Sequence, residues 1–406
     1  MKIIKLSFLL LIILSETATA QLSIEDSLAY KNREKELLDS LLNDNNSLEL
    51  MKSLALHYRE YGELEKSNEI FEKLIKTHNY YRSYFSIAYN YAILEEQAKS
   101  FDYIQNGLDL APTDSNMFFG ALIYHILDSN LKSLKLLEKI LSTNDQHQAA
   151  LSLYCDLKFY IEDSTDFFTS IQKLEKIDNS YSEVYKHYAR YYYIREEYNK
   201  AYENINKAIL LHSEDEYYFV LRGLLLYYLK KYELAIQDFL LFYDTDDYII
   251  LKNLYLGRSY AKLDSLENSF QYYMVLEPIM DDRFDYLDFY HLGVYYFNKD
   301  DFIKAGYFYE KSMNLDSNHS NTLNDIGLLY WYTKNDEKAQ YYLKKSLLLD
   351  PDDIIVLQNY ALFLAYKKDI SGTIEVLDRL IQVDPDNIDV YEKAKQKLKN
   401  EGLIEF

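Results

Sequence analysis

Residues 320–353 read SNTLNDIGLLYWYTKNDEKAQYYLKKSLLLDPDD, and this stretch decides the fold. Gly327 and Tyr330 are three positions apart and therefore share one face of a helix. A polar run then breaks the apolar pattern before the pattern resumes at Ala339. The Asp-Pro pair at 350–351 closes the stretch, because Pro ends one helix and Asp can cap the next. The stretch therefore predicts two helices joined by a short turn.

Three columns of residues repeat this pattern along the chain with a period of 34 residues, lengthened once to 36. The first column is small: Ala189, Gly223, Gly257, Gly293, Gly327 and Ala361. The second, twelve positions later, is mostly small: Ala201, Ala235, Ser269, Ala305, Ala339 and Thr373. The third, three positions after the first, is mostly aromatic: Tyr192, Leu226, Tyr260, Tyr296, Tyr330 and Leu364. Small residues are needed where two helix axes approach closely, and aromatic rings fill the space between neighbouring units.

The columns resemble the tetratricopeptide repeat, a helix–turn–helix unit of 34 residues with small, aromatic, small and proline positions in this order. The small column extends back through Cys155, Gly120, Ala88 and Ala55, which gives about ten units over residues 48–387. The resemblance implies an all-α fold, a right-handed α-solenoid of about ten tetratricopeptide helix–turn–helix repeats.

The rest of the chain is expected to cap this array. Residues 21–47 have a helical apolar rhythm without the columns, which predicts an N-terminal capping helix. Residues 388–406 are expected to form a C-terminal capping helix and a tail. No Gly-, Ser- or Pro-rich linker separates these pieces, so we expect one continuous array. Phe167 stands where a small residue is expected, which leaves the repeat boundaries between 113 and 180 open, and Pro278 predicts a bend late in its helix.

Residues 1–20, MKIIKLSFLLLIILSETATA, have the three parts of a secretory signal peptide. Two lysines make a positive start, a short apolar run follows, and Ala18 and Ala20 mark a small-residue cleavage site. An uncleaved membrane anchor is the alternative, but the apolar run is short for a span of about 20 residues and Glu16 interrupts it. We therefore expect cleavage after Ala20, an exported protein that is periplasmic or secreted, and no membrane span after cleavage.

The composition argues against several classes of protein. Lys and Arg number 44 against 65 Asp and Glu, and the net charge of −21 repels the phosphates of nucleic acid. The single cysteine, Cys155, permits no internal disulfide, and its place in the small column predicts a buried thiol. The common catalytic and nucleotide-binding motifs are absent, and no two of the eight histidines are three or four residues apart. We therefore expect no enzyme activity, no cofactor and no metal site.

The family resemblance also indicates candidate binding residues, because first helices line the concave surface of tetratricopeptide arrays. By that resemblance, Lys186, Arg190 and Arg258 fall at groove-facing positions, with Tyr193 and Tyr227 beside them. We expect an acidic peptide or chain terminus to bind there, across units five to seven, held largely by charge. The alternative interpretation is that these bases neutralise nearby acids of the chain itself. If the bases do not bind, the expected site is the aromatic stretch around three other residues: Tyr290, Asn324 and Trp331.

Together these features predict a non-enzymatic scaffold of the cell envelope or exterior, which binds a peptide segment or a partner protein in its concave groove. The alternative function is binding of carbohydrate or peptidoglycan fragments through exposed aromatic rings. A glycan or peptide array would discriminate the two.

Overall fold

The computed structural model describes five stretches of the chain: residues 24–161, 164–212, 215–241, 249–280 and 283–401. Every regular element in these stretches is a helix, which confirms the predicted all-α fold. None of the described helices combines the length and the apolar character needed to cross a membrane. The expected signal peptide, residues 1–20, lies outside the described residues.

The described residues form two compact units, which divide between Lys252 and Asn253 within one helix. Unit 1 precedes this point and unit 2 follows it. The expected continuity of one array across this point stays a prediction.

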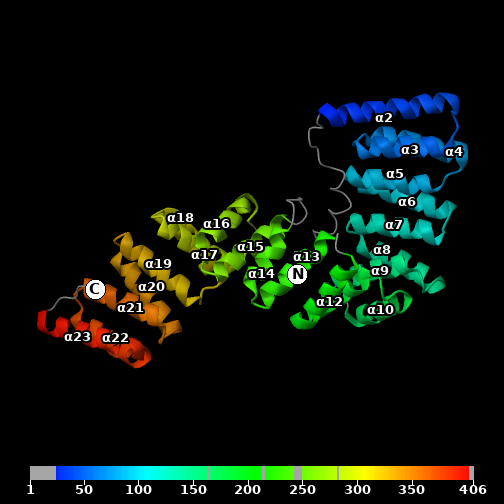
Figure 1. Ribbon diagram of the computed structural model, residues 1–406. Coiled ribbons are helices and arrows are strands. Elements are labelled where there is room, and N and C mark those ends of the chain that lie inside the picture. Colours follow the sequence, from blue (N-terminus) through cyan, green and yellow to red (C-terminus); the bar gives the residue numbers. More distant parts are fainter. Residues whose placement is uncertain (1–23, 162–163, 213–214, 242–248, 281–282, 402–406) are drawn as a thin grey trace. The chain divides into compact units, whose positions relative to one another are not determined.

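Unit 1 begins with a single helix and continues as successive helix pairs (Figure 1). Its helices are α2 (Ile24–Asn43), α3 (Leu48–Glu60), α4 (Leu64–His78), α5 (Arg82–Ile93), α6 (Gln97–Leu110), α7 (Asp114–Ile126), α8 (Asn130–Thr143), α9 (Gln148–Tyr160), α10 (Ser164–Ile177), α11 (Ser182–Ile194), α12 (Tyr198–Leu211), α13 (Glu216–Tyr228) and α14 (Tyr232–Leu240). The leading helix α2 packs Leu37 against Leu54 and Tyr58 of α3, so the first pair has an apolar cover.

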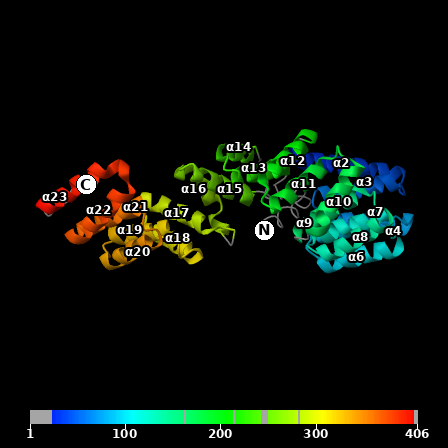
Figure 2. The ribbon, with the colours of Figure 1, turned by 90° about the horizontal axis from the view of Figure 1, so that it is seen from below.

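Unit 2 holds the larger part of α15 and closes with a single helix, and Figure 2 shows α19 to α22 side by side as two pairs. Its elements are α15 (Ile249–Lys262), α16 (Leu266–Val275), the 3-10 turn η1 (Glu277–Ile279), α17 (Tyr286–Asn298), α18 (Phe302–Leu315), α19 (Ser320–Tyr332), α20 (Asp336–Leu349), α21 (Ile354–Tyr366), α22 (Ile370–Val383), the 3-10 turn η2 (Pro385–Asn387) and α23 (Ile388–Glu401). With α15 and α16 counted as one pair, the described stretches hold ten helix pairs, in agreement with the predicted number.

The small column marks the contact between the two helices of a pair. A Cβ atom on Gly257 would lie 2.6 Å from the Tyr273 ring, and one on Gly327 would lie 2.7 Å from Cγ of Leu343. These distances are far below ordinary van der Waals contact, so the paired helix already fills the space of a larger side chain. In both pairs the contacting residue follows the glycine by sixteen positions.

The turn inside nine of the ten pairs repeats a second feature. The residue two positions after the first helix has a positive φ: 76° at Gly62, 60° at Lys230 and 62° at Lys334. This left-handed conformation favours glycine, and other residues adopt it at a cost of about 1 kcal/mol. Since charged residues occupy most of these positions, the spacing of glycines does not reveal these repeated turn positions.

Four positions singled out by the sequence have defined roles in the structure. Asp353 caps α21 through a hydrogen bond from a backbone N–H at 3.0 Å, whereas Asp350 is too far upstream to do so. Pro278 lies in η1, after α16 has ended, so the helix stops there instead of bending. Phe167 is fully buried in α10, which fills a place expected to be small with an aromatic ring. Cys155 is buried as predicted, and burial raises the pKa of its thiol.

Candidate functional site

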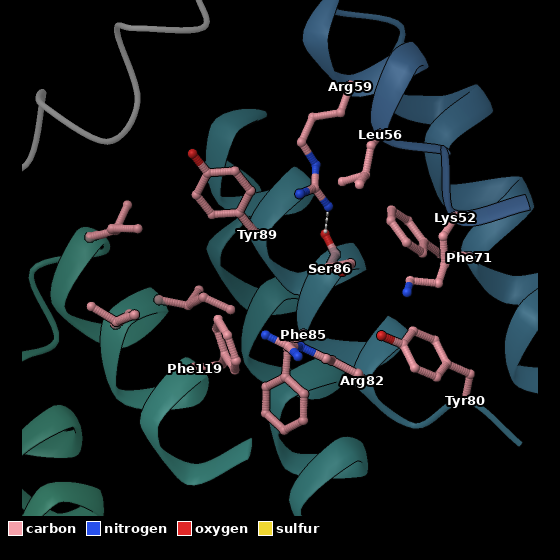
Figure 3. Close-up of a pocket in the computed structure, with 13 residues that line it drawn as sticks. Lys52, Leu56, Arg59, Phe71, Tyr80, Arg82, Phe85, Ser86, Tyr89 and Phe119 are labelled. Atoms are coloured by element: carbon pink, nitrogen blue, oxygen red, sulfur yellow. Dashed lines mark hydrogen bonds between the residues drawn. The ribbon is translucent and has the colours of Figure 1, made fainter. Parts of the chain in front are cut away.

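A hollow opens in unit 1 where the first helices of three successive pairs, α3, α5 and α7, come together (Figure 3). Its volume is about 420 Å³, which lies within the range of ligand-binding pockets. The lining residues are Lys52, Leu56, Arg59, Phe71, Tyr80, Arg82, Phe85, Ser86, Tyr89, Phe119, Leu122, Ile123 and Ile126. Those on each first helix follow one another at intervals of one, three or four residues, so each helix turns one face to the hollow.

The hollow has an apolar floor and an apolar wall. Phe71, Phe85 and Ile123 are each at most 3% exposed and belong to the packed interior of the helix pairs. Leu56 also lines the hollow and is 48% exposed. Exposed apolar surface that rims a concave site is stabilised when a partner covers it.

Arg59 is held in a fixed position at one side of the hollow. Its Nε donates to Oδ1 of Asn90 at 2.7 Å, and its Nη2 donates to the carbonyl of Ser86 at 3.1 Å, as Figure 3 shows for Ser86. The guanidinium also lies 5.3 Å from the Phe71 ring and 5.2 Å from the Tyr89 ring. These contacts fix the charge of Arg59 beside the apolar floor.

Two more cations complete the lining. Arg82 stacks on Phe119, with the guanidinium carbon 4.2 Å from the ring centroid. Lys52 lies 3.0 Å from the carboxylate of Glu49 and 5.5 Å from the Tyr80 ring. None of the thirteen described lining residues is Asp or Glu. The hollow is therefore a locally positive site in a chain of net charge −21.

Lys186 and Arg190, on α11, do not face an open groove. Their side chains are 2% and 0% exposed. Arg190 donates to Asp156 at 2.5 Å and to the hydroxyl of Tyr217 at 2.7 Å. Lys186 lies 3.3 Å from Asp156 and also pairs with Glu183. Since α9 and α13 supply two of these partners, helix packing closes this part of the surface, and the predicted groove-facing position is corrected for both bases.

The same cluster has the geometry of a metal site, but its carboxylates are already balanced by buried bases. Asp156, Glu183 and His187 bring ligand atoms within 4.8 Å of one another. The two buried bases already supply two positive charges against the two carboxylates. Nε2 of His187 lies 3.1 Å from the hydroxyl of Ser152, and burial lowers the pKa of His187 well below its ordinary value. The cluster is thus a balanced structural network, and we assign no metal to it.

Arg258, on α15, is likewise paired with an acidic side chain inside unit 2. Its Nε lies 2.9 Å from Oδ1 of Asp288, and its Nη2 lies 2.5 Å from Oδ2. The hydroxyl of Tyr273 donates to the same carboxylate at 2.7 Å. Burial raises the pKa of Asp288, and the adjacent guanidinium opposes that shift. Arg258 therefore fastens α15 to α17, which corrects its predicted role as an open ligand contact.

Tyr193 and Tyr227 come together through a third ring. Their ring centroids lie 5.7 Å and 5.6 Å from that of Tyr228, on which Tyr198 stacks at 4.9 Å. Tyr193 and Tyr227 stand close to the ends of α11 and α13 and are partly buried. They belong to an aromatic cluster beside the turns of two neighbouring pairs.

The second predicted stretch lies in unit 2, and its residues are separated. Asn324 is buried and donates to Asp325 at 2.9 Å. Burial raises the pKa of Asp325 to about 6, against the opposing hydrogen bonds of Asn324 and Tyr290. Trp331 lies two turns further along α19, edge-on to Phe363 at 5.7 Å. The structure thus brings Tyr290 and Asn324 together at Asp325 and leaves Trp331 apart.

Sequence reasoning did not single out the hollow, although the repeat columns contain its signal. Lys52 stands three positions before Ala55, and Leu56 stands one position after it. Lys186 and Arg190 have the same two offsets from Ala189. These offsets therefore identify residues of the hollow when they are applied to the first two units. They do not show which positions are closed by acids from neighbouring helices.

Comparison with known proteins adds one family match. The family model described as Tetratricopeptide repeat matches residues 320–353. No curated protein matches the chain. Similar solved structures are a tetratricopeptide repeat protein from Parabacteroides merdae (14% identity, 58% of this chain, 93% of that chain, TM-score 0.47), the APC/C hetero-tetramer Cut9-Hcn1 (14%, 95%, 98%, 0.41) and PilF of Pseudomonas aeruginosa (17%, 51%, 93%, 0.41). With TM-scores below 0.5, these likenesses carry no information about sites or partners.

Proposed function

We propose that this chain, a tetratricopeptide repeat protein by its repeat at residues 320–353, is a non-enzymatic scaffold of the cell envelope or exterior. Proteins of this fold serve as protein–protein interaction scaffolds. The proposed ligand is a segment of a partner protein, and the proposed site is the hollow of α3, α5 and α7. The proposed location rests on the signal peptide expected from the first twenty residues.

One observation carries the proposal, namely an apolar hollow of about 420 Å³ built from the first helices of three successive repeats. A pocket of this size holds one or two side chains of a partner, while its rim remains accessible to the partner backbone. The first-helix side is also the side on which the family resemblance predicts a groove. By contrast, the basic residues predicted from the middle repeats are used internally.

Site-specific photo-crosslinking tests the proposal. A benzoylphenylalanine at Leu56, in the wall of the hollow, should crosslink one partner segment that mass spectrometry can identify. The matched control is Leu131, an exposed leucine on α8 that does not line the hollow and is 73% exposed. A synthetic peptide of the captured segment should then bind the purified protein and compete with crosslinking at Leu56. Equal crosslinking from Leu131, or no binding by the peptide, would overturn the proposed site.

Glycan binding is the second candidate, and exposed rings in unit 2 favour it. Tyr307, Tyr332 and Tyr341 are 54%, 60% and 60% exposed, and such rings can stack on the apolar face of a sugar. A glycan and peptidoglycan-fragment array should give binding that is lost with Tyr332→Ala if this function holds. An array without any signal would remove the candidate.

A further inference from the structure

We infer that the hollow of α3, α5 and α7 selects a partner segment in which a large apolar side chain lies between two carboxylates. This inference rests on the proposed function and adds the chemistry of the ligand. The sequence predicts an acidic ligand at repeats five to seven. The inference places that ligand at the first three repeats instead.

Charge is the first reason. Lys52, Arg59 and Arg82 line the hollow, and no described lining residue carries a negative charge. Acids outnumber bases 65 to 44 in the whole chain, so a lining with three cations and no acid has the opposite charge balance to the chain. A site of this kind favours an anionic ligand and repels a cationic one.

Arg82 is the cation best placed to bind a carboxylate. It is exposed at the start of α5, and no carboxylate of the described residues pairs with it. Its contact with the Phe119 ring uses no hydrogen bond to an acid, and carboxylates bind a guanidinium along its N–H edge. Figure 3 shows this side chain reaching between Tyr80 and Phe119. The stacked ring thus holds the guanidinium ready for a ligand.

Lys52 can serve as the second contact, because its present partner is weak. Glu49 is 77% exposed, and exposed ion pairs of this kind contribute little to stability. A ligand carboxylate can therefore replace that of Glu49 without a large loss. Arg59 adds its charge while its own hydrogen bonds keep it in place.

The apolar part of the hollow is the second reason. Leu56 and the ring of Phe119 line the hollow together with the buried Phe71 and Phe85, so a large apolar side chain finds carbon atoms around it. Covering an exposed leucine of this kind favours binding through the hydrophobic effect. Carboxylates alone would leave this surface in contact with water.

The length of the cationic lining along α3 sets the distance over which carboxylates can be held. Lys52 and Arg59 are seven residues apart on α3, which corresponds to about 10 Å along the helix axis. A peptide in the polyproline II conformation advances about 3.1 Å per residue with three residues per turn, so carboxylates three positions apart lie on one side of it and span about the same length. The apolar side chain then lies between them.

Designed peptides test the inference directly, because they need to carry only the proposed chemistry of the ligand. The probe is a fluorescein-labelled peptide with Glu-Phe-Leu-Glu between Gly-Ser flanks, titrated into the full chain and followed by fluorescence anisotropy. Comparison peptides carry Gln-Phe-Leu-Gln or Glu-Ser-Ser-Glu. We expect the first peptide to bind at least tenfold more tightly than either of the others, and its affinity should fall as salt is raised.

Matched protein variants locate the effect. Arg82→Gln should weaken the Glu-Phe-Leu-Glu peptide about tenfold, as expected for the loss of one charge-assisted contact. Arg195→Gln makes the same change of charge at an arginine of unit 1 that is 55% exposed and outside the hollow, and it should leave affinity unchanged. Circular dichroism of both variants should match that of the native chain.

The outcomes separate this inference from the proposed function. If Gln-Phe-Leu-Gln binds as tightly and Arg82→Gln has no effect, the acidic specificity is wrong, although a segment crosslinked at Leu56 would still support the scaffold. If sodium decanoate displaces the peptide at equal concentration, the site takes any amphipathic carboxylate and the proposed peptide specificity is overturned. If Arg195→Gln weakens binding as much as Arg82→Gln, the charges act from a distance and the hollow is not the site.

Discussion

Two glycine-to-alanine substitutions in unit 2 should change stability in opposite directions. In Gly257→Ala, the new methyl group would lie 2.6 Å from the ring of Tyr273. That ring is 1% exposed, and its hydroxyl is bound to Asp288, so it has little room to move. Overpacking of this kind costs about 1–3 kcal/mol, and the rigid ring favours the upper end. Alanine regains about 1 kcal/mol of helix propensity, which leaves a net destabilisation of about 2 kcal/mol.

Gly306→Ala is the matched control, because it makes the same chemical change in the interior of α18. Here the nearest atom to the new methyl group is Cδ2 of Leu329 at 3.4 Å, an ordinary contact. Only the propensity gain of about 1 kcal/mol remains. Since 1 kcal/mol shifts the melting temperature of a unit this large by about 2–4 °C, Gly257→Ala should lower it by about 4–8 °C and Gly306→Ala should raise it by about 2–4 °C. Thermal melting followed by circular dichroism at 222 nm measures both, and shifts of the same sign would refute the packing argument.

Three further substitutions probe the internal charges and the turns. Asp156→Ala should lower the free energy of unfolding, measured by urea denaturation, by about 3–5 kcal/mol, because it leaves two buried bases without their shared carboxylate. A loss below about 1 kcal/mol would contradict the network. Lys334→Gly should stabilise the protein by about 1 kcal/mol because φ is 62° there. Lys344→Gly, inside α20, should destabilise it by about 1 kcal/mol. Equal effects of the two substitutions would refute the left-handed conformation at Lys334. Burial raises the pKa of Asp325 to about 6, so the folded chain binds more protons than the unfolded chain between pH 4 and 6, and this group lowers stability as pH rises. Asp325→Asn should therefore gain stability relative to the native chain from pH 4 to pH 7, by up to about 3 kcal/mol, and a constant difference would exclude this titration.

The helix pairs could be predicted from the sequence because their signal is local. The contact between Gly327 and Leu343 joins residues sixteen positions apart, and its small residue recurs at a fixed period. The left-handed turn positions were not predicted, because residues such as Lys334 occupy them at a modest energetic cost and show no preference that a sequence pattern reveals. Local period thus determines which residues form helices and which helices pair.

The candidate site depends on contacts that the period does not contain. Arg190 and Arg258 stand at the predicted positions on their helices. Arg190 is bound by Asp156 and Arg258 by Asp288, and each acid lies on a helix that is not the next one along the chain. Side-chain reach and helix packing decide these pairings, and the sequence spacing alone does not. Arg82 differs from them because its neighbour across the hollow is the ring of Phe119 instead of an acid. A base with no acidic partner among the described residues is therefore a better indicator of an open site than a base at a groove position.

The opposition between a positive hollow and an acidic chain predicts an unusual salt dependence for the designed acidic peptide. At 10 mM salt the Debye length is about 30 Å, so the peptide approaches under the repulsion of a net charge of −21. At 150 mM it is about 8 Å, and the distant acids are screened while the cations that line the hollow remain within reach. Added salt should therefore raise the association rate constant and raise the dissociation rate constant still more. Stopped-flow fluorescence at the two salt concentrations separates these rates. An association rate that falls with salt would mean that the approach is governed by the local cations, and the net charge of the chain would then have no part in selecting its partner.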